Sequence, residues 1–410
     1  GGSRGTSGQR PGPVVNFVLS QTLGALRHVG VLFSLRLLPF AIWAIFGRSA
    51  TWRSKVLAAV AYSAFPALAW HLGAAPAIRL VAIGAAYYFA VCLLGANRLS
   101  AVMATGQVTR GAALVLVFVV FLLVPGVAFA GPAVPSFLIF GWELALSAYS
   151  YCVETSRPGA VPAPTSESLF FLLVNPTLVY TARGTPLATP VGTRGLLRAG
   201  AGVALMFANA AVVWALADYV HGACRSAAGV AALALWPTYG IIRFLSLYAS
   251  HSGLASVHIG LMRQLAWRVP ERYDYPLLST GPMDFWRRWN TYVRTWLEVY
   301  VFFPIARSMA RRTQRRAGQV VAAMATLVLS GLIHDAYSFA ALQSTDGLRM
   351  TKLFVAACAL LVIWGLAAGI GKTLRRRLGD ERATWFAAAQ TLLSRCALAT
   401  ALVGAAITWG

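Results

Sequence analysis

Long apolar runs separated by short polar and basic segments fill most of the chain. A helix that spans a bilayer needs roughly 20 mainly apolar residues. Stretches near this length lie at 29–46, 56–73, 77–95, 111–130, 136–153, 200–220, 228–249, 318–340, 351–371 and 385–408. The pattern therefore predicts an all-α, polytopic membrane protein with about ten transmembrane helices. Residues 1–13, rich in Gly, Ser and Pro, predict a disordered tail, and residues 14–410 predict a single membrane domain.

Other segments break this simple alternation. Residues 14–28 predict an interfacial helix that leads into the first span. Residues 167–180 are apolar but too short to cross a bilayer, and Pro176 interrupts them, so they predict a re-entrant or surface-lying helix. Residues 251–316 combine apolar, aromatic and basic side chains, and the candidate chemistry gathers there.

Composition and charge support a membrane location. Hydrophobic residues make up 58% of the chain and charged residues 11%, against roughly a quarter charged in soluble domains. The net charge of +23 comes from basic residues that fall mainly between the apolar runs, as the positive-inside rule expects of cytoplasmic loops. We therefore assign the loops near 47–55, 96–110, 154–199, 250–317 and 372–384 to the cytoplasm, and both chain ends to the outside. The charge is attributed to topology and anionic lipids rather than nucleic acid, and the predicted location is a bacterial inner membrane.

The first group of candidate residues lies between Pro282 and Trp296. Asp284, two residues after Pro282, predicts a helix N-cap. A single helix would then place four residues on one aromatic face, since they recur at spacings of three and four: Trp286, Trp289, Val293 and Trp296.

Three arginines accompany this aromatic pattern. Arg287, Arg288 and Arg294 can reach phosphates or lipid head groups. Taken alone, the segment is equally typical of an aromatic and basic belt that anchors a helix at the membrane interface.

The second group is Ser330-Gly331-Leu332-Ile333-His334-Asp335, inside an otherwise apolar run. A histidine in a membrane helix is costly unless it is paired or faces a cavity. A neutral imidazole is also the usual general base near neutral pH. The alternative is a structural histidine that hydrogen-bonds a backbone carbonyl. The remaining histidines and the five cysteines lack metal-ligand spacing, so no metal is predicted.

Together the two groups resemble the membrane-bound O-acyltransferase superfamily. The sequence Asp284-Phe-Trp-Arg-Arg-Trp-Asn290, followed by Ser330-Gly-x-x-His334, is closest in phrasing to wax synthases and to sterol and diacylglycerol acyltransferases. A weaker similarity covers Gly141-Trp142-Glu143 and Asn175-Pro176. The alginate and teichoic-acid branch typically has His where this chain has Asn290, which weighs against a polysaccharide acetylase.

The resemblance implies helices around a central tunnel, with the catalytic half at about 200–410. It implies that His334 is the general base and that Asn290 holds the acyl carbonyl or orients the acceptor, both facing one cavity. It also implies binding roles for Trp286, Arg287, Arg288, Trp289 and Arg294. The donor substrate would be acyl-CoA, without a permanently bound cofactor, and the acceptor a lipid or other hydrophobic alcohol.

Two alternatives stay open. Within the same class, the protein would O-acylate an extracytoplasmic glycan or a secreted metabolite. Outside it, the chain would be a catalytically silent lipid-binding or transport protein. Retention of both Asn290 and His334 argues against the silent protein, because a protein without chemistry has no need of a buried histidine.

Overall fold

A computed structural model describes residues 51–125, 134–160, 165–173, 177–180, 193–280, 282–311 and 315–342, with single positions at 20, 23 and 175. The expected tail at 1–13, the interfacial helix at 14–28 and the spans at 29–46, 351–371 and 385–408 lie outside these residues. Within them the chain is helical, as the apolar pattern predicts.

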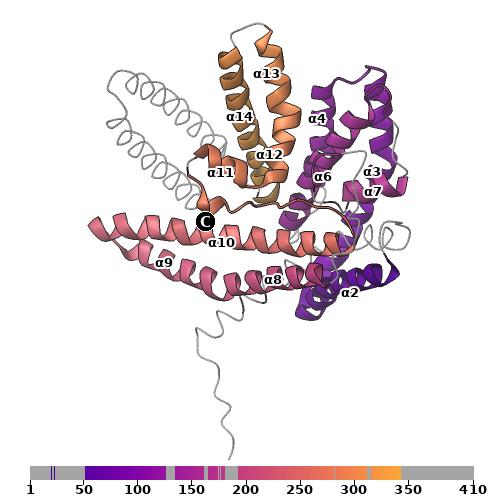
Figure 1. Cartoon of the computed structure of the whole chain (residues 1–410). Helices are drawn as coiled ribbons and strands as arrows, with labels where there is room; N and C mark the ends of the chain where they lie inside the picture. The colour runs from indigo at the N-terminus through magenta and orange to yellow at the C-terminus, as the bar shows by residue number, and fades with distance from the viewer. Residues whose placement is uncertain are drawn as a thin grey trace, which may run out of the picture.

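The N-terminal part forms one group of helices around α6 (Figure 1). Helix α6 (Val134–Thr155) contacts α3 (Ala75–Ala104), α4 (Arg110–Phe118), α7 (Thr165–Leu173) and the π-helical turn η2 (Val119–Leu123). Helix α2 (Trp52–Ala69) and the turn η1 (Trp70–Ala74) precede α3. The short apolar segment expected near 167–180 is indeed a short helix, α7.

A second group is a long helical pair. Helix α8 (Arg194–Ala208), the π-helical turn η3 (Asn209–Trp214) and α9 (Ala215–Ser226) run along α10 (Gly229–Gln264), and Figure 1 shows them side by side. At 1.5 Å per residue, the 36 residues of α10 extend over about 54 Å.

The third group carries both candidate motifs. It comprises the 3-10 turn η4 (Pro276–Leu278), α11 (Pro282–Arg288), α12 (Thr291–Leu297), the π-helical turn η5 (Glu298–Phe302), α13 (Phe303–Ala310) and α14 (Arg315–Leu342). Helices α13 and α14 pack side by side, while α11 and α12 lie between them and α10 (Figure 1). Helix α14 also contacts α6 and η5.

Four of the described helical segments are long and apolar enough to cross a membrane: Ala82–Ala104, Arg194–Ser226, Gly229–Gln264 and Gly318–Asp335. They overlap four predicted spans, and three of them are longer than expected. The full count of about ten spans and the central tunnel remain predictions.

The expected boundary at residue 249 of the seventh span is wrong. The chain continues as helix α10 to Gln264, where a cytoplasmic loop was predicted. This extension is also the most buried part of the helix, with Val257, Leu261 and Met262 in the main core. His251 and other polar residues made the segment look like a loop, but its apolar residues still recur at helical spacing.

Paired glycines bring α8 and α10 together. A Cβ atom at Gly202 would lie 2.5 Å from the Gly253 carbonyl oxygen, and one at Gly195 would lie 2.6 Å from the Gly260 carbonyl oxygen. The two glycines on each helix are seven residues apart, so the close contact between α8 and α10 repeats after two helical turns. Small residues of this kind allow close backbone packing in membrane helices.

We expect Gly202→Ala to destabilise the protein by about 1–3 kcal/mol, because the new methyl group meets backbone atoms that cannot rotate away. Gly200→Ala is the matched control, since a Cβ atom there meets nothing within 4 Å. It should be neutral or stabilise the helix by up to about 1 kcal/mol. Unfolding in mixed micelles would measure both, and equal effects would contradict the glycine contact.

Candidate active site

Asn290 lies at a break between α11 and α12. Its backbone is left-handed, with φ 40° and ψ 64°, a conformation that Asn tolerates better than most residues. The neighbouring backbone is anchored to residues 271–274: the Thr291 amide donates to the Arg272 carbonyl at 2.8 Å, and the Asp274 amide donates to the Arg288 carbonyl at 3.0 Å. The single helix expected across this motif is therefore wrong, and its tryptophans do not share one face.

A buried ion pair holds the side chain of Asn290 through a hydrogen bond. Arg272 Nη1 lies 2.9 Å from Glu143 Oε1 of α6, and the two side chains are 14% and 12% exposed. Arg272 Nε also donates to Asn290 Oδ1 at 3.2 Å. The amide oxygen of Asn290 is thereby assigned to Arg272, which leaves its NH₂ group to act as a donor elsewhere.

The charges around Arg272 favour its ionised form. Burial disfavours the charged guanidinium, but the neighbouring Glu143, together with Tyr273 and Tyr292, more than offsets this and raises the pKa of Arg272. Nearby, burial alone would raise the pKa of Glu271, whereas Arg198 and Arg263 together outweigh it and lower that pKa. Glu271 thus joins α8 and α10 to the residues that precede Arg272.

His334 lies on α14, and its Nδ1 atom donates to the Ser330 carbonyl oxygen at 2.6 Å. A carbonyl oxygen only accepts, so Nδ1 carries the proton and Nε2 carries the lone pair of the neutral ring. This is the hydrogen bond expected of a structural histidine. It also fixes the tautomer that a general base needs.

Helix α6 links the two motif residues. The Trp142 and His334 ring centroids are 6.0 Å apart, while the next residue, Glu143, holds Arg272 and through it Asn290. Residues far apart in sequence thus converge on adjacent positions of one helix. That Asn290 and His334 share a cavity remains a prediction.

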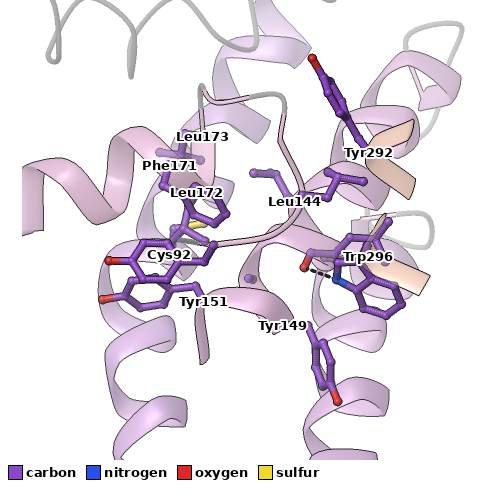
Figure 2. Packing of buried hydrophobic residues seen from close by; sticks show 14 of the residues in the cluster. Cys92, Leu144, Tyr149, Tyr151, Phe171, Leu172, Leu173, Tyr292 and Trp296 are labelled. Carbon is purple, nitrogen blue, oxygen red and sulfur yellow. Dashed lines mark hydrogen bonds between the residues drawn. The ribbon is translucent and has the colours of Figure 1, made fainter. Parts of the chain in front are cut away.

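The two candidate tryptophans have different surroundings. Trp289 packs among Phe244 and Tyr248 of α10, Tyr273 and Phe285, with ring centroids 5.2–6.0 Å away. Trp286 packs against the main core. Trp296, seven residues after Trp289, is fully buried and donates from Nε1 to the Leu146 carbonyl of α6 at 2.9 Å (Figure 2).

The three candidate arginines also differ. Arg288 pairs with Asp284 at 3.0 Å, and Arg294 pairs with Glu298 at 3.3 Å. Arg287 is exposed at the end of α11. Carboxylates already compete for Arg288 and Arg294, so Arg287 is the strongest of the three candidates for an external phosphate.

Asp284 is not the N-cap residue that the sequence predicted, because it lies inside the helix. Helix α11 begins at Pro282, which places Asp284 inside the first turn. Its carboxylate accepts from the Thr280 backbone amide at 3.0 Å and from Arg288. These hydrogen bonds lower the pKa of Asp284, the larger contribution coming from Thr280. The residue still stabilises the start of the helix, but by reaching back along the chain.

Sequence reasoning missed the role of Glu143 and Arg272. A signal was present, because Glu143 is an acidic residue within an apolar run and a buried carboxylate requires a cationic partner. Arg272, in a segment crowded with basic residues, could not be singled out as that partner without the fold.

The part of the chain that carries both motifs is similar in sequence to a known protein family. Residues 269–356 match the profile of the membrane bound O-acyl transferase family. This range contains Asn290, His334 and all five candidate binding residues. In this range the chain is similar to membrane-bound O-acyltransferases, and its four long apolar helices among the described residues support an integral membrane protein.

Three relatives illustrate the range of the similarity. The chain is 30% identical over 137 residues to a probable alginate O-acetylase AlgI of Pseudomonas aeruginosa, covering 33% of this chain and 22% of the relative. It is 30% identical over 125 residues to a probable long-chain-alcohol O-fatty-acyltransferase 1 of Arabidopsis thaliana, covering 28% and 37%. A long-chain-alcohol O-fatty-acyltransferase of Simmondsia chinensis is 28% identical over 109 residues, covering 26% and 31%. Each match therefore spans well under half of the relative.

Removing Arg272 should be far more damaging than removing a surface arginine. We expect Arg272→Ala to cost about 3–5 kcal/mol, because it leaves the Glu143 charge buried without its partner. Arg157→Ala breaks an exposed pair with Glu154 on the same α6 and should cost at most about 1 kcal/mol. The double variant Glu143→Leu/Arg272→Met should recover much of the loss. Similar effects of the two single variants on unfolding in mixed micelles would refute the buried-pair interpretation.

Proposed function

We propose that the protein is an O-acyltransferase that moves an acyl group from a thioester donor, acyl-CoA, to the hydroxyl of a lipid or other hydrophobic alcohol. The observation that carries this proposal is the convergence on α6, where Trp142 contacts His334 and Glu143 supports Asn290 through Arg272. A base and an amide donor are thus both tied to one turn of helix, which is the pair of groups that acyl transfer requires.

In the proposed reaction, the acceptor hydroxyl attacks the thioester carbonyl carbon while His334 Nε2 takes the hydroxyl proton. The carbonyl oxygen gains charge, and the Asn290 NH₂ group donates to it. The carbon–sulfur bond then breaks, and the leaving thiolate takes the proton from His334. The products are an ester and free CoA thiol, with the histidine neutral again.

The assigned hydrogen bonds suit these roles. The Ser330 carbonyl keeps the proton on His334 Nδ1, so Nε2 can act as the base. Arg272 occupies the Asn290 oxygen, so its amide presents donors rather than an acceptor to a carbonyl. Both residues are therefore oriented before substrate binds, which lowers the reorganisation needed during the reaction.

The names of the relatives refer to two different classes of acceptor substrate. The plant proteins carry names that refer to long-chain alcohols, and the bacterial ones refer to alginate. Asn290 at the first motif position favours the hydrophobic alcohol, as does the apolar character of the chain. O-acylation of an extracytoplasmic glycan or secreted metabolite is the second candidate, supported by the alginate acetylase similarity.

We expect His334→Ala to abolish acyl transfer while the folded protein remains intact. His251→Ala is a matched control, because His251 Nδ1 makes the same kind of contact, 2.8 Å from the carbonyl oxygen four residues before it. Release of CoA thiol and lipid products should be measured in nanodiscs with acetyl- and palmitoyl-CoA. The acceptors would be long-chain alcohols, diacylglycerol and an oligosaccharide.

Wild-type turnover in His334→Ala would refute the base assignment. Products on the oligosaccharide alone would favour the second candidate. If the wild-type protein binds alcohols yet transfers no acyl group from any donor, the silent lipid-binding alternative would replace the proposal.

Arg287→Ala should raise KM for acyl-CoA by roughly tenfold with little change in KM for the acceptor, since a lost phosphate contact is worth about 1–2 kcal/mol. Arg225→Ala, an exposed arginine at the end of α9, serves as the control. Saturation curves in each substrate would separate the two constants. An unchanged donor KM would return Arg287 to the role of a membrane anchor.

A further inference from the structure

Trp142 has a buried hydrogen-bond donor without an acceptor. Its Nε1 atom is shielded from solvent, and no partner for it is found among the described residues. Leaving a polar N–H group unsatisfied in a buried position is costly, and native proteins satisfy most such groups. An unpaired donor of this kind therefore calls for an explanation, and one explanation is that it donates to a bound substrate.

The position of the indole suggests which ligand. The Trp142 ring lies against His334, with centroids 6.0 Å apart and planes tilted by 56°. The next residue along α6 is Glu143, which orients Asn290 through Arg272. The indole that carries the unpaired donor thus packs against the proposed base, and it is one residue away from the carboxylate that supports the proposed carbonyl-binding amide.

Packing fixes this part of α6. A Cβ atom at the preceding Gly141 would overlap the Phe121 carbonyl oxygen and the Tyr88 hydroxyl. Tyr88 itself donates to the Phe121 carbonyl at 3.2 Å. Because Gly141 is pressed against η2 and α3, the backbone that carries the adjacent Trp142 is held in place.

We propose that Trp142 Nε1 donates a hydrogen bond to the carbonyl oxygen of the bound thioester, as a second donor beside Asn290. This rests on the proposed function, because it requires an acyl donor next to His334. The unsatisfied N–H group is then satisfied by substrate, and most strongly when the oxygen gains charge. Two donors on one oxygen are the usual arrangement for acyl transfer.

Trp296 offers a matched control for this proposal. Its indole Nε1 is also buried beside α6, but it already donates to the Leu146 carbonyl. Trp142→Phe removes an unpaired N–H group and should lower kcat by about 10²–10³-fold, with unchanged stability and donor KM. Trp296→Phe removes a paired one and should lower stability while folded molecules keep their kcat. Wild-type kcat in Trp142→Phe would overturn the proposal.

A binding measurement separates this proposal from the proposed function. The protein, with its 13 tryptophans labelled with ¹⁵N at the indole nitrogen, would be studied by NMR in nanodiscs, and Trp142→Phe would identify the Trp142 signal. A ketone analogue of acyl-CoA, which keeps a carbonyl but cannot transfer it, should move the Trp142 indole proton downfield. An S-alkyl thioether of CoA, which lacks the carbonyl, should not.

The downfield shift would support the Trp142 donor even if no acceptor were ever acylated, a result that would count against the proposed function alone. No shift with the ketone analogue, or the same shift with both analogues, would overturn the Trp142 proposal whether or not the wild-type protein turns over.

Discussion

Glu143 and Arg272 meet in a part of the protein where neither charge could exist alone. Both side chains are largely shielded from solvent, and their atoms lie 2.9 Å apart. Removing two charges from water costs several kcal/mol for each ion, and only a close partner and further hydrogen bonds offset that cost. Arg272 meets the requirement by bonding to both Glu143 and Asn290. The same interaction therefore joins α6 to the segment before α11 and orients a candidate catalytic side chain.

The geometry around Asn290 depends on this connection. The break between α11 and α12 needs a residue that accepts a left-handed backbone, and the flanking amides and carbonyls bond to residues 272 and 274. In a continuous helix through this motif, the direction of the Asn290 side chain would be set by the helical repeat. At the break, the Asn290 side chain instead accepts a hydrogen bond from Arg272. It also separates Trp289, which packs against α10, from Trp296, which packs against α6.

The positions of helices could be predicted from the sequence where a continuous apolar run was the only pattern present. Helices α3, α6 and α14 lie where continuous apolar runs predict them, because burial in lipid or protein demands little else of those residues. Prediction failed where two requirements overlapped. The second half of α10 carries histidine, serine and arginine among its core residues, so its polarity concealed its helical period. The spacing of the motif tryptophans fits one helix, but a local left-handed residue, which spacing cannot reveal, divides it into two.

The site shows the same limit. Asn290 and His334 were recognisable as motif residues from the short sequences around them, whereas Arg272 and Trp142 matter only because of what the fold brings near them. A buried carboxylate such as Glu143 predicts that a cation must exist, yet several basic residues within 251–316 qualified equally. Sequence alone could identify the candidate reacting groups, but not the residues that hold those groups in place.

The structure explains why the supporting residues gather on α6. Gly141 allows α6 to pack directly against Phe121 and Tyr88, and Trp296 bonds to α6 one turn further along. With the helix fixed on both sides, the side chains at 142 and 143 have defined directions, one toward His334 and one toward Arg272. A base on α14 and an amide between α11 and α12 belong to separate helices that could shift independently. Attaching each of them to neighbouring residues of one constrained helix limits such shifts, and the proposed reaction requires that limit because it needs His334 at the attacking hydroxyl and Asn290 at the carbonyl.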